Sequence, residues 1–426
     1  MSRTRYWVGA ALAWSLAVAG AGSEMRTWTS VSGVKVTAEF VEMQGNFAVL
    51  RGENGKDMKV DVGKLSAADR AYVHDLVGGA APAKQVPDRP VGQIIKDVAV
   101  DDAPEWSYLL YLPSTFKPDR KWPVLYILGP GGGSEYDVQR YVKGAEFNGW
   151  ILAMSTQRRN GFDDSGKAVR AMDHHVRRTL PIDEDMVFIT GMSGGTRDAF
   201  WYASEEGRSF AGDRKLHFAG VLACGAGTEY PLTRKTVTYG LCGSNCFNRW
   251  DMACSFKTLL NRDWRLRFFP GNHDWANDDL LMDAMCWLEG YCLKNAKATD
   301  PQIAERREAY LTRMLGRIKS LAQSDVERAY DAAAFLADFP LPGPALTGVN
   351  ECLQELLKKP EVQLYVQGLK DMEKFVDKFY GQNPNGLREE NGSHGVQGPA
   401  EKYATKYAGT SLAEVFRRMG QRSVEP

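Results

Sequence analysis

The chain has 426 residues, and its 53 basic and 53 acidic side chains give a formal net charge of zero. Nucleic-acid binding depends on an excess of positive charge, so this balance argues against a nucleic-acid partner. Hydrophobic residues make up 44% of the chain, which is enough for a sizeable core. The length predicts two or three domains rather than one.

The first 23 residues predict a secretory signal peptide. Arg3 and Arg5 precede an apolar run at 7–19, and small residues follow at 19–23. The run is short for a membrane span, so we expect cleavage near residues 19–23 and no membrane span afterwards. The alternative is an uncleaved anchor. Cleavage predicts a secreted or periplasmic protein.

Residues 25–76 predict a small β-rich domain. Apolar and polar residues alternate at 34–40 and again at 58–62, on either side of an Asn54-Gly55 turn. The segment is similar to the Sla-homology domain of endocytic adaptors, through residues 28–33, 38–41, 49–50, 54–56 and 65–69. That family is a Src-homology-3-like barrel that binds short peptides. The resemblance implies a peptide or surface partner for this domain.

The remainder of the chain predicts an α/β domain followed by helices. Residues 77–91 are rich in Gly, Ala and Pro and predict a linker. Strand and helix patterns alternate over 92–297, and several strands are continuous apolar runs, as in a parallel sheet buried on both faces. Residues 298–426 predict a helical region. The predicted strands of the sheet cover residues 106–112, 124–128, 150–154, 186–190, 218–223, 237–241 and 265–269.

The most informative segment is Gly191-Met192-Ser193-Gly194-Gly195. It follows the predicted strand at 186–190 and precedes a predicted helix at 196–206. The order of strand, G-x-S-x-G and helix is typical of a nucleophile elbow, in which glycines give room for a sharp turn that exposes a serine hydroxyl. It predicts Ser193 as a nucleophile. The alternative is an ordinary strand-to-helix turn.

A serine nucleophile needs a base and hydrogen-bond donors for the oxyanion. His273 lies in a loop just after the last predicted strand, a position that none of the other five histidines shares, so it is the candidate base. The N–H of Gly194 is one expected oxyanion donor. The glycine-rich loop at 129–133, which follows an earlier strand, offers the second donor from Gly132 or Gly133.

Residues 92–295 resemble secreted esterases of the α/β-hydrolase superfamily, and among them the feruloyl and acetylxylan esterase and polyhydroxybutyrate depolymerase group. The resemblance rests on residues 131–133, 191–195, 247–249 and 270–275. It implies an α/β-hydrolase sheet and ester hydrolysis through an acyl-enzyme, in which Ser193 attacks and His273 relays the proton. It implies an ester of a polysaccharide or other polymer as substrate, and no cofactor. The cysteines and histidines also lack the spacing of a zinc site.

The acid of the triad is where the chain departs from this family. The family pattern reads Gly-x-x-Asp-Phe-Asn-Arg after the penultimate strand, whereas residues 243–249 read Gly-Ser-Asn-Cys-Phe-Asn-Arg, with Cys246 in place of the aspartate. Three interpretations are open: Asp251 supplies the carboxylate, Glu229 supplies it, or the serine and histidine alone form a weaker dyad or no catalyst. We favour Asp251, and we expect a carboxylate beside the histidine nitrogen that faces away from the serine.

Seven cysteines in an exported chain predict one or more disulfides. The candidate partners of Cys246 are Cys224, Cys242 and Cys254, and the sequence does not decide among them. We expect that a thiol at position 246 cannot hold an imidazolium as a carboxylate does, and that a disulfide there cannot hold it at all.

Two other functions compete with the esterase. A hydrolase-fold protein that has lost its acid could bind a polymer or a cell-surface ligand, with the β-rich domain and the helices as docking parts. A serine peptidase on the same fold is the second. The short segment between Ser193 and His273 leaves no room for a propeller or a large lid, which argues against a prolyl-oligopeptidase type.

Overall fold

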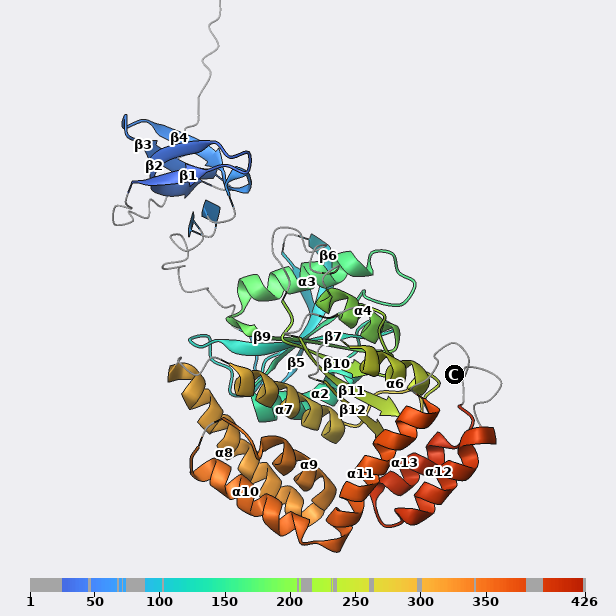
Figure 1. The fold of residues 1–426 in the computed structure, drawn as a ribbon. Helices are drawn as coiled ribbons and strands as arrows, with labels where there is room; N and C mark the ends of the chain where they lie inside the picture. Colours follow the sequence, from blue (N-terminus) through green and yellow to red (C-terminus); the bar gives the residue numbers. More distant parts are fainter. Residues whose placement is uncertain are drawn as a thin grey trace, which may run out of the picture. The chain divides into compact units, whose positions relative to one another are not determined.

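The computed structural model describes residues 25–44, 47–66, 69–70, 72–73, 89–101, 103–204, 207, 217–230, 232, 236–259, 264–296, 301–340, 342–380 and 394–423. The chain divides into two compact units, Met1–Gln85 and Val86–Pro426 (Figure 1). The predicted signal peptide and residues 77–88 of the predicted linker lie outside the described residues. In the part of the chain that is described, no helix is long and apolar enough to cross a membrane.

The first unit is a four-stranded antiparallel sheet. Its elements are β1 (Arg26–Thr29), β2 (Lys35–Gln44), β3 (Phe47–Gly52), β4 (Asp57–Asp61) and the 3-10 helix η1 (Val62–Lys64), with the strands paired in chain order. Trp28, Ala38 and Leu50 are buried on one face, because side chains alternate between the two faces of a strand. Asp69 accepts hydrogen bonds from Arg26 at 2.6 Å and from the Thr29 N–H at 2.7 Å, which ties the following segment to β1. The predicted small β domain is confirmed.

The second unit is built on an eight-stranded sheet. Its strands are β5 (Ile94–Val100), β6 (Ala103–Tyr111), β7 (Trp122–Leu128), β8 (Ile151–Ser155), β9 (Ile182–Met192), β10 (Gly220–Cys224), β11 (Val237–Gly243) and β12 (Trp264–Phe269). The order is β12-β11-β10-β9-β7-β8-β6-β5; the strands from β12 to β8 run parallel, and β6 pairs antiparallel with both of its neighbours. β7, β8, β10 and β11 are buried along their whole length.

Helices cover both faces of this sheet, which explains the continuous apolar runs in its strands. α2 (Glu135–Asn148) and α7 (Asp278–Asn295) pack on one face. α3 (Ser165–Thr179), α4 (Gly194–Ala203) and α6 (Arg249–Thr258) pack on the other. The predicted α/β-hydrolase fold is confirmed.

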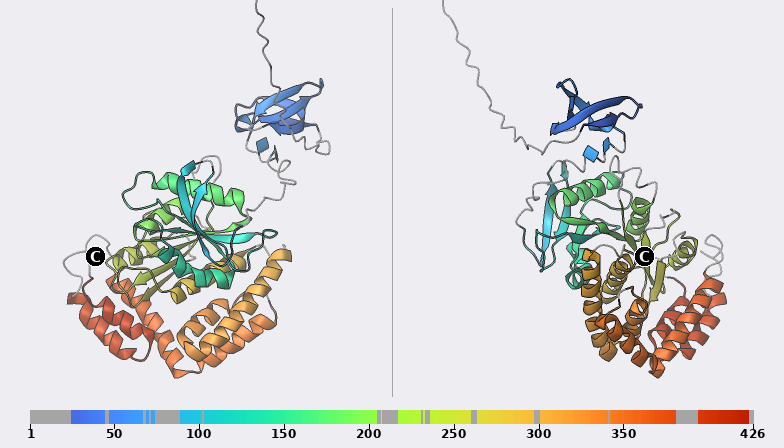
Figure 2. Two further views of the ribbon diagram at one scale, coloured as in Figure 1. Left: turned by 180° about the vertical axis from the view of Figure 1, so that it is seen from behind. Right: turned by 60° about the vertical axis from the view of Figure 1, so that its left-hand side comes forward.

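The C-terminal helices belong to the same unit and pack at the β12 end of the sheet (Figure 2). They are α8 (Pro301–Ser324), α9 (Val326–Leu336), α10 (Pro344–Leu357), α11 (Pro360–Phe379), α12 (His394–Lys406) and α13 (Ser411–Met419). Arg265 and Arg267 of β12 both pair with Asp331 of α9, at 2.8 and 3.1 Å. The unpaired side of an edge strand is thereby covered within the chain.

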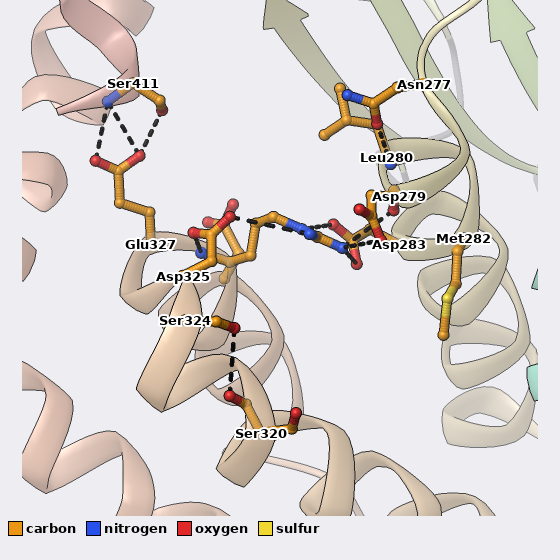
Figure 3. A network of polar contacts seen from close by, with 12 residues as sticks. Asn277, Asp279, Leu280, Met282, Asp283, Ser320, Ser324, Asp325, Glu327 and Ser411 are labelled. Atoms are coloured by element: carbon orange, nitrogen blue, oxygen red, sulfur yellow. Dashed lines mark hydrogen bonds and ion pairs between the residues drawn. The ribbon is translucent and has the colours of Figure 1, made fainter.

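A polar network joins α7 to α9 and α13 (Figure 3). Asp283 of α7 accepts a hydrogen bond from Arg328 of α9 at 2.7 Å. Glu327, next to that arginine, accepts the N–H of Ser411 at 3.0 Å, at the start of α13. The network therefore links the helix that covers the sheet to the helices that follow it in the chain.

Candidate active site

Ser193 lies at the turn between β9 and α4, at the carboxyl edge of the sheet. Its backbone has φ 53° and ψ −118°, in a region that residues with a Cβ rarely adopt. Its N–H donates to the carbonyl of Cys224 at the end of β10, at 3.0 Å, and its carbonyl accepts the Thr196 N–H at 3.0 Å. The side chain is partly exposed. A strained, accessible serine at this turn is the arrangement that the G-x-S-x-G motif predicts.

Close backbone packing explains two of the glycines in this motif. A Cβ on Gly191 would clash with the backbone of Gly195, and a Cβ on Gly195 would clash with the carbonyl oxygen of Leu128 on β7. The Thr196 hydroxyl fixes the turn from the other side, since it donates to the Cys224 carbonyl at 2.7 Å and accepts the Cys224 N–H at 3.1 Å. The neighbouring strands therefore impose the serine conformation.

His273 lies in the loop after β12, and its Nδ1 atom is 3.0 Å from the Cys246 Sγ atom. The Phe247 ring packs on the imidazole with a centroid distance of 4.0 Å and an interplanar angle of 37°. Two backbone hydrogen bonds join the loop after β11, which carries Cys246, to the loop after β12, which carries His273. Ser244 donates its N–H to Phe269 at 2.8 Å, and Asn245 donates its N–H to Gly271 at 2.9 Å.

The histidine loop and the serine turn meet at Gly225, which follows β10. This residue has a φ of +65°, and a Cβ there would lie 2.8 Å from the Met192 Cε atom and 3.4 Å from the His273 Nδ1 atom. Met192 precedes Ser193 directly, and Cys224 accepts the serine N–H. The structure therefore brings the predicted nucleophile and the predicted base to one place at the carboxyl edge of the sheet.

Within its described residues, the structure shows no carboxylate bonded to His273, where one is expected. Asp251 lies in the first turn of α6, where its Oδ2 atom is 2.9 Å from the Arg197 guanidinium and accepts the Gly227 N–H at 3.1 Å. Glu229 is exposed to solvent. Among the described residues, the group recorded at the His273 Nδ1 atom is a thiol. Asp251 therefore pairs with Arg197 of α4 and not with the histidine.

Cys246 is fully buried, and hydrogen-bond donors surround its sulfur. The Asn248 N–H donates to it at 3.3 Å, and the neighbouring Cys242 thiol is hydrogen-bonded to it. The hydrogen bond from Cys242, followed by the hydrogen bond and charge of His273, lowers the pKa of Cys246 to about 5, although burial acts in the opposite direction. Burial raises the pKa of Cys242 well above its ordinary value, so Cys242 keeps its proton.

All seven cysteines are free thiols, so the predicted disulfides are not formed in this structure. Cys242 neighbours Cys246 as a free thiol, whereas the other candidate partners have other surroundings. The Cys254 thiol donates to the Tyr380 carbonyl at 2.9 Å, and Cys224 and Cys242 are buried in the strands β10 and β11. In the part of the chain that is described, no group of three His, Cys, Asp or Glu side chains is placed to hold a metal ion.

The glycine-rich loop between β7 and α2 lies beside the serine turn. Gly132 has a φ of +104°, which a residue with a Cβ would adopt only with strain. Of the two predicted donors, Gly133 directs its N–H to the Thr156 carbonyl at 3.4 Å. Asn160 stabilises the glycine-rich loop, because its N–H donates to the Pro130 carbonyl at 2.8 Å.

Arg158 is a site residue that the sequence does not reveal. Its guanidinium is buried, donates to the Gly129 carbonyl at 2.5 Å, and donates to Asp198 of α4 at 2.8 Å. It thereby joins the glycine-rich loop to the helix that carries the serine. No motif marks it, since an arginine in a loop after a strand is most often solvated.

A groove of about 500 Å³ opens beside Gly194. Its lining combines polar side chains, such as Asn160 and Arg197, with the aromatic rings of Phe162 and Trp201. The groove gives a substrate room next to the serine turn.

A comparison with known protein families identifies the first unit. Residues 19–80 match the protein family described as SLA1 homology domain 1, which confirms the resemblance of the first unit. No curated protein sequence is significantly similar to this chain.

Solved structures similar to this chain include several esterases. A thermostable esterase has 17% identity over 46% of this chain, and 61% of that protein's own length is covered, with a TM-score of 0.33. An arylesterase has 13% identity over 53% of this chain and 92% of its own, with a TM-score of 0.38. The esterase 2 of Thermogutta terrifontis, phosphonylated by sarin, has 15% identity over 49% of this chain and 95% of its own, with a TM-score of 0.35.

Proposed function

We propose that the protein is an exported serine esterase that hydrolyses its substrate through an acyl-serine intermediate. The observation that carries this proposal is the strained backbone of Ser193, φ 53° and ψ −118°, at a turn that also meets the His273 loop. Strain of this kind persists only where the surrounding structure imposes it, and it is concentrated at active sites. This geometry supports Ser193 as the nucleophile.

In the proposed reaction, the Ser193 Oγ atom attacks the ester carbonyl carbon while His273 accepts the hydroxyl proton. The C–O bond to the alcohol then breaks, and the histidine returns the proton to the leaving alcohol. A water molecule repeats both steps on the acyl-serine, which releases the acid and restores the serine. Each step moves one proton through the same imidazole.

The oxyanion is held by backbone N–H groups. Gly194 is the first residue of α4, and the first N–H groups of a helix have no partner within the helix and carry a positive partial charge. Gly132 is the proposed second donor. Loss of one such donor typically costs about 3 kcal/mol of transition-state stabilisation.

We further propose that the substrate is an ester of a polysaccharide or another polymer, as in the feruloyl and acetylxylan esterase and polyhydroxybutyrate depolymerase group. The polar and aromatic lining of the groove beside Gly194 is compatible with such a ligand. The predicted signal peptide supports a secreted or periplasmic location. The SLA1 homology domain would then dock to a peptide or surface partner.

A fluorophosphonate probe tests the enzyme directly, because it reacts only with an activated serine. We expect one adduct per chain, mapped to Ser193 by peptide mass spectrometry, and hydrolysis of p-nitrophenyl esters. Both should disappear in Ser193→Ala while the thermal unfolding midpoint stays the same. A folded wild-type protein that takes up no probe would overturn the proposal. A parallel panel of chromogenic peptides separates an esterase from a peptidase.

A second candidate function is a hydrolase-fold binding protein that has little or no catalytic activity. The observation that favours it is the thiol of Cys246 at His273, where the esterase family has a carboxylate. Binding of an insoluble polysaccharide by an unlabelled, inactive wild-type protein would support this candidate.

A further inference from the structure

We propose that Cys246 is the positioning residue of this site, and that its thiolate accepts the Nδ1–H of His273 in place of a carboxylate. This inference rests on the proposed esterase function. The Sγ and Nδ1 atoms are 3.0 Å apart, within hydrogen-bond range for sulfur. The contact joins the loop after β11 to the loop after β12. It therefore lies at the histidine, which is where a serine hydrolase needs its orienting group.

The hydrogen bonds around the sulfur select its charged form. The Asn248 N–H points at the sulfur at 3.3 Å, and the Cys242 thiol, which neighbours it, donates to the Gly243 carbonyl at 3.5 Å. A neutral thiol is a weak acceptor, whereas an ionised group accepts several hydrogen bonds well. A sulfur that accepts the Asn248 N–H in addition to the imidazole N–H is therefore stabilised as a thiolate.

The charged and titratable groups around Cys246 agree with this assignment. His273 approaches from the loop after β12, and Cys242 approaches from β11. Arg249 of α6 is buried and donates to the Cys246 main-chain carbonyl at 3.1 Å, which holds the backbone of this residue in place. The nearest carboxylate of α6, Asp251, is turned toward Arg197 and does not compete.

The burial of Cys246 shows that it can orient the histidine but cannot act as the nucleophile. Cys246 is 0% exposed, so its sulfur cannot reach an ester carbonyl, whereas Ser193 is partly exposed beside the groove. With Nδ1 bound to sulfur, the histidine carries its proton on Nδ1 and keeps Nε2 free to accept the serine proton. When that proton arrives, the thiolate stabilises the imidazolium and is not itself consumed.

The experiment compares Cys246→Ser and Cys246→Asp with the wild-type protein. The matched control is Cys352→Ser, a partly buried cysteine of α10 far along the chain from the site loops. Loss of the orienting group should lower kcat/KM of Cys246→Ser by about 10²- to 10⁴-fold. Aspartate should restore kcat/KM to within about tenfold of wild type, because it supplies an acceptor of the same charge. The control should match the wild type.

A second measurement reads the charge on the sulfur without relying on activity. The ultraviolet absorbance of one thiolate should be present in the wild type and in Cys352→Ser, absent from Cys246→Ser, and lost as the pH falls through about 5. A Cys246→Ser variant as active as the wild type, or a wild type with no thiolate absorbance above this pH, would overturn the inference alone. A folded wild type that neither reacts with fluorophosphonate nor hydrolyses esters would overturn the proposed function and this inference together.

Discussion

At the scale of single residues, the conformation of Ser193 depends on the absence of a side chain at the glycines around it. Gly195 lies against the Leu128 carbonyl so closely that no side chain fits between α4 and β7. The backbone strain of Ser193 is therefore held by packing between a strand and a helix, and a methyl group at position 195 would have to move one of them.

We expect Gly195→Ala to destabilise the protein by about 3 kcal/mol, because its Cβ would clash with backbone that cannot move aside. Ester hydrolysis should fall with it, since the serine turn is displaced. The matched control is Gly316→Ala in the middle of α8, where a Cβ meets nothing within 4 Å; it should stabilise the protein by about 1 kcal/mol. Urea unfolding followed by circular dichroism measures both, and equal stability of the two variants would contradict the clash.

The residues of the site differ in how far the sequence reveals them. Ser193 and His273 are predicted from local patterns, because a glycine-flanked serine and a histidine after the last strand carry their own signals, and the structure brings their two loops together at Gly225. The partner of the histidine is not found, because the pattern locates position 246 but only a carboxylate is expected there. Asp251 is not at the histidine for a physical reason: it lies in the first turn of α6, where its carboxylate accepts a hydrogen bond from Arg197 of α4.

At the scale of whole elements, the parallel strands are predicted well and the edge strand β5 is not. The central strands are continuous apolar runs because both faces are covered, but β5 exposes Lys96 and Asp97 in its middle. Asp97 also has a φ of 49°, and the pairing register shifts between Ile95 and Val98. An irregular strand with one neighbour gives no periodic signal.

Helices α11 and α12 are joined by a charge pair with a definite pH dependence. Asp371 accepts hydrogen bonds from Lys406, at 2.7 Å, and from the Tyr407 hydroxyl. These bonds, with that of Lys406 the stronger, lower the pKa of Asp371 to about 2, from 3.8. A lowered pKa in the folded state stabilises the protein at pH values above the unfolded pKa, and the contribution is lost as the pH falls through about 2.

Asp371→Asn should therefore cost about 1–2 kcal/mol of stability at neutral pH. This figure allows for solvent screening of the charge pair, because Lys406 is 51% exposed. The difference from the wild type should shrink as the pH falls from about 4 toward about 2. Asp377→Asn on the same helix removes an exposed pair with Lys257 and should cost less than about 0.5 kcal/mol. Urea titrations over a pH series test this, and a gap that persists at the lowest pH would show that the charge is not the cause.

At the scale of the whole molecule, Arg249 connects the segment after the C-terminal helices to the loop that carries Cys246. Arg249 donates one hydrogen bond to the Cys246 carbonyl, at 3.1 Å, and another to the Gln421 carbonyl beyond α13, at 3.0 Å. The second partner lies 172 residues away in the chain. No local pattern can reveal a contact of that separation, which is why the sequence predicts the helices but not their purpose.

Two truncations separate the contributions of the two units and of the helices. Deletion of residues 1–85 should leave kcat/KM for a small soluble ester within about twofold of the full chain, because every described site residue lies in Val86–Pro426.

Deletion of residues 298–426 removes Asp331 from Arg265 and Arg267. It also uncovers apolar residues of α6 and β12, such as Phe256 and Phe268. Since uncovered apolar surface and an open strand edge favour aggregation, we expect this fragment to be insoluble or to unfold without cooperativity. Size-exclusion chromatography and thermal unfolding, followed by fluorophosphonate labelling, report these outcomes. A soluble, cooperatively folded fragment that reacts at Ser193 would show instead that the hydrolase sheet holds its site without the helices.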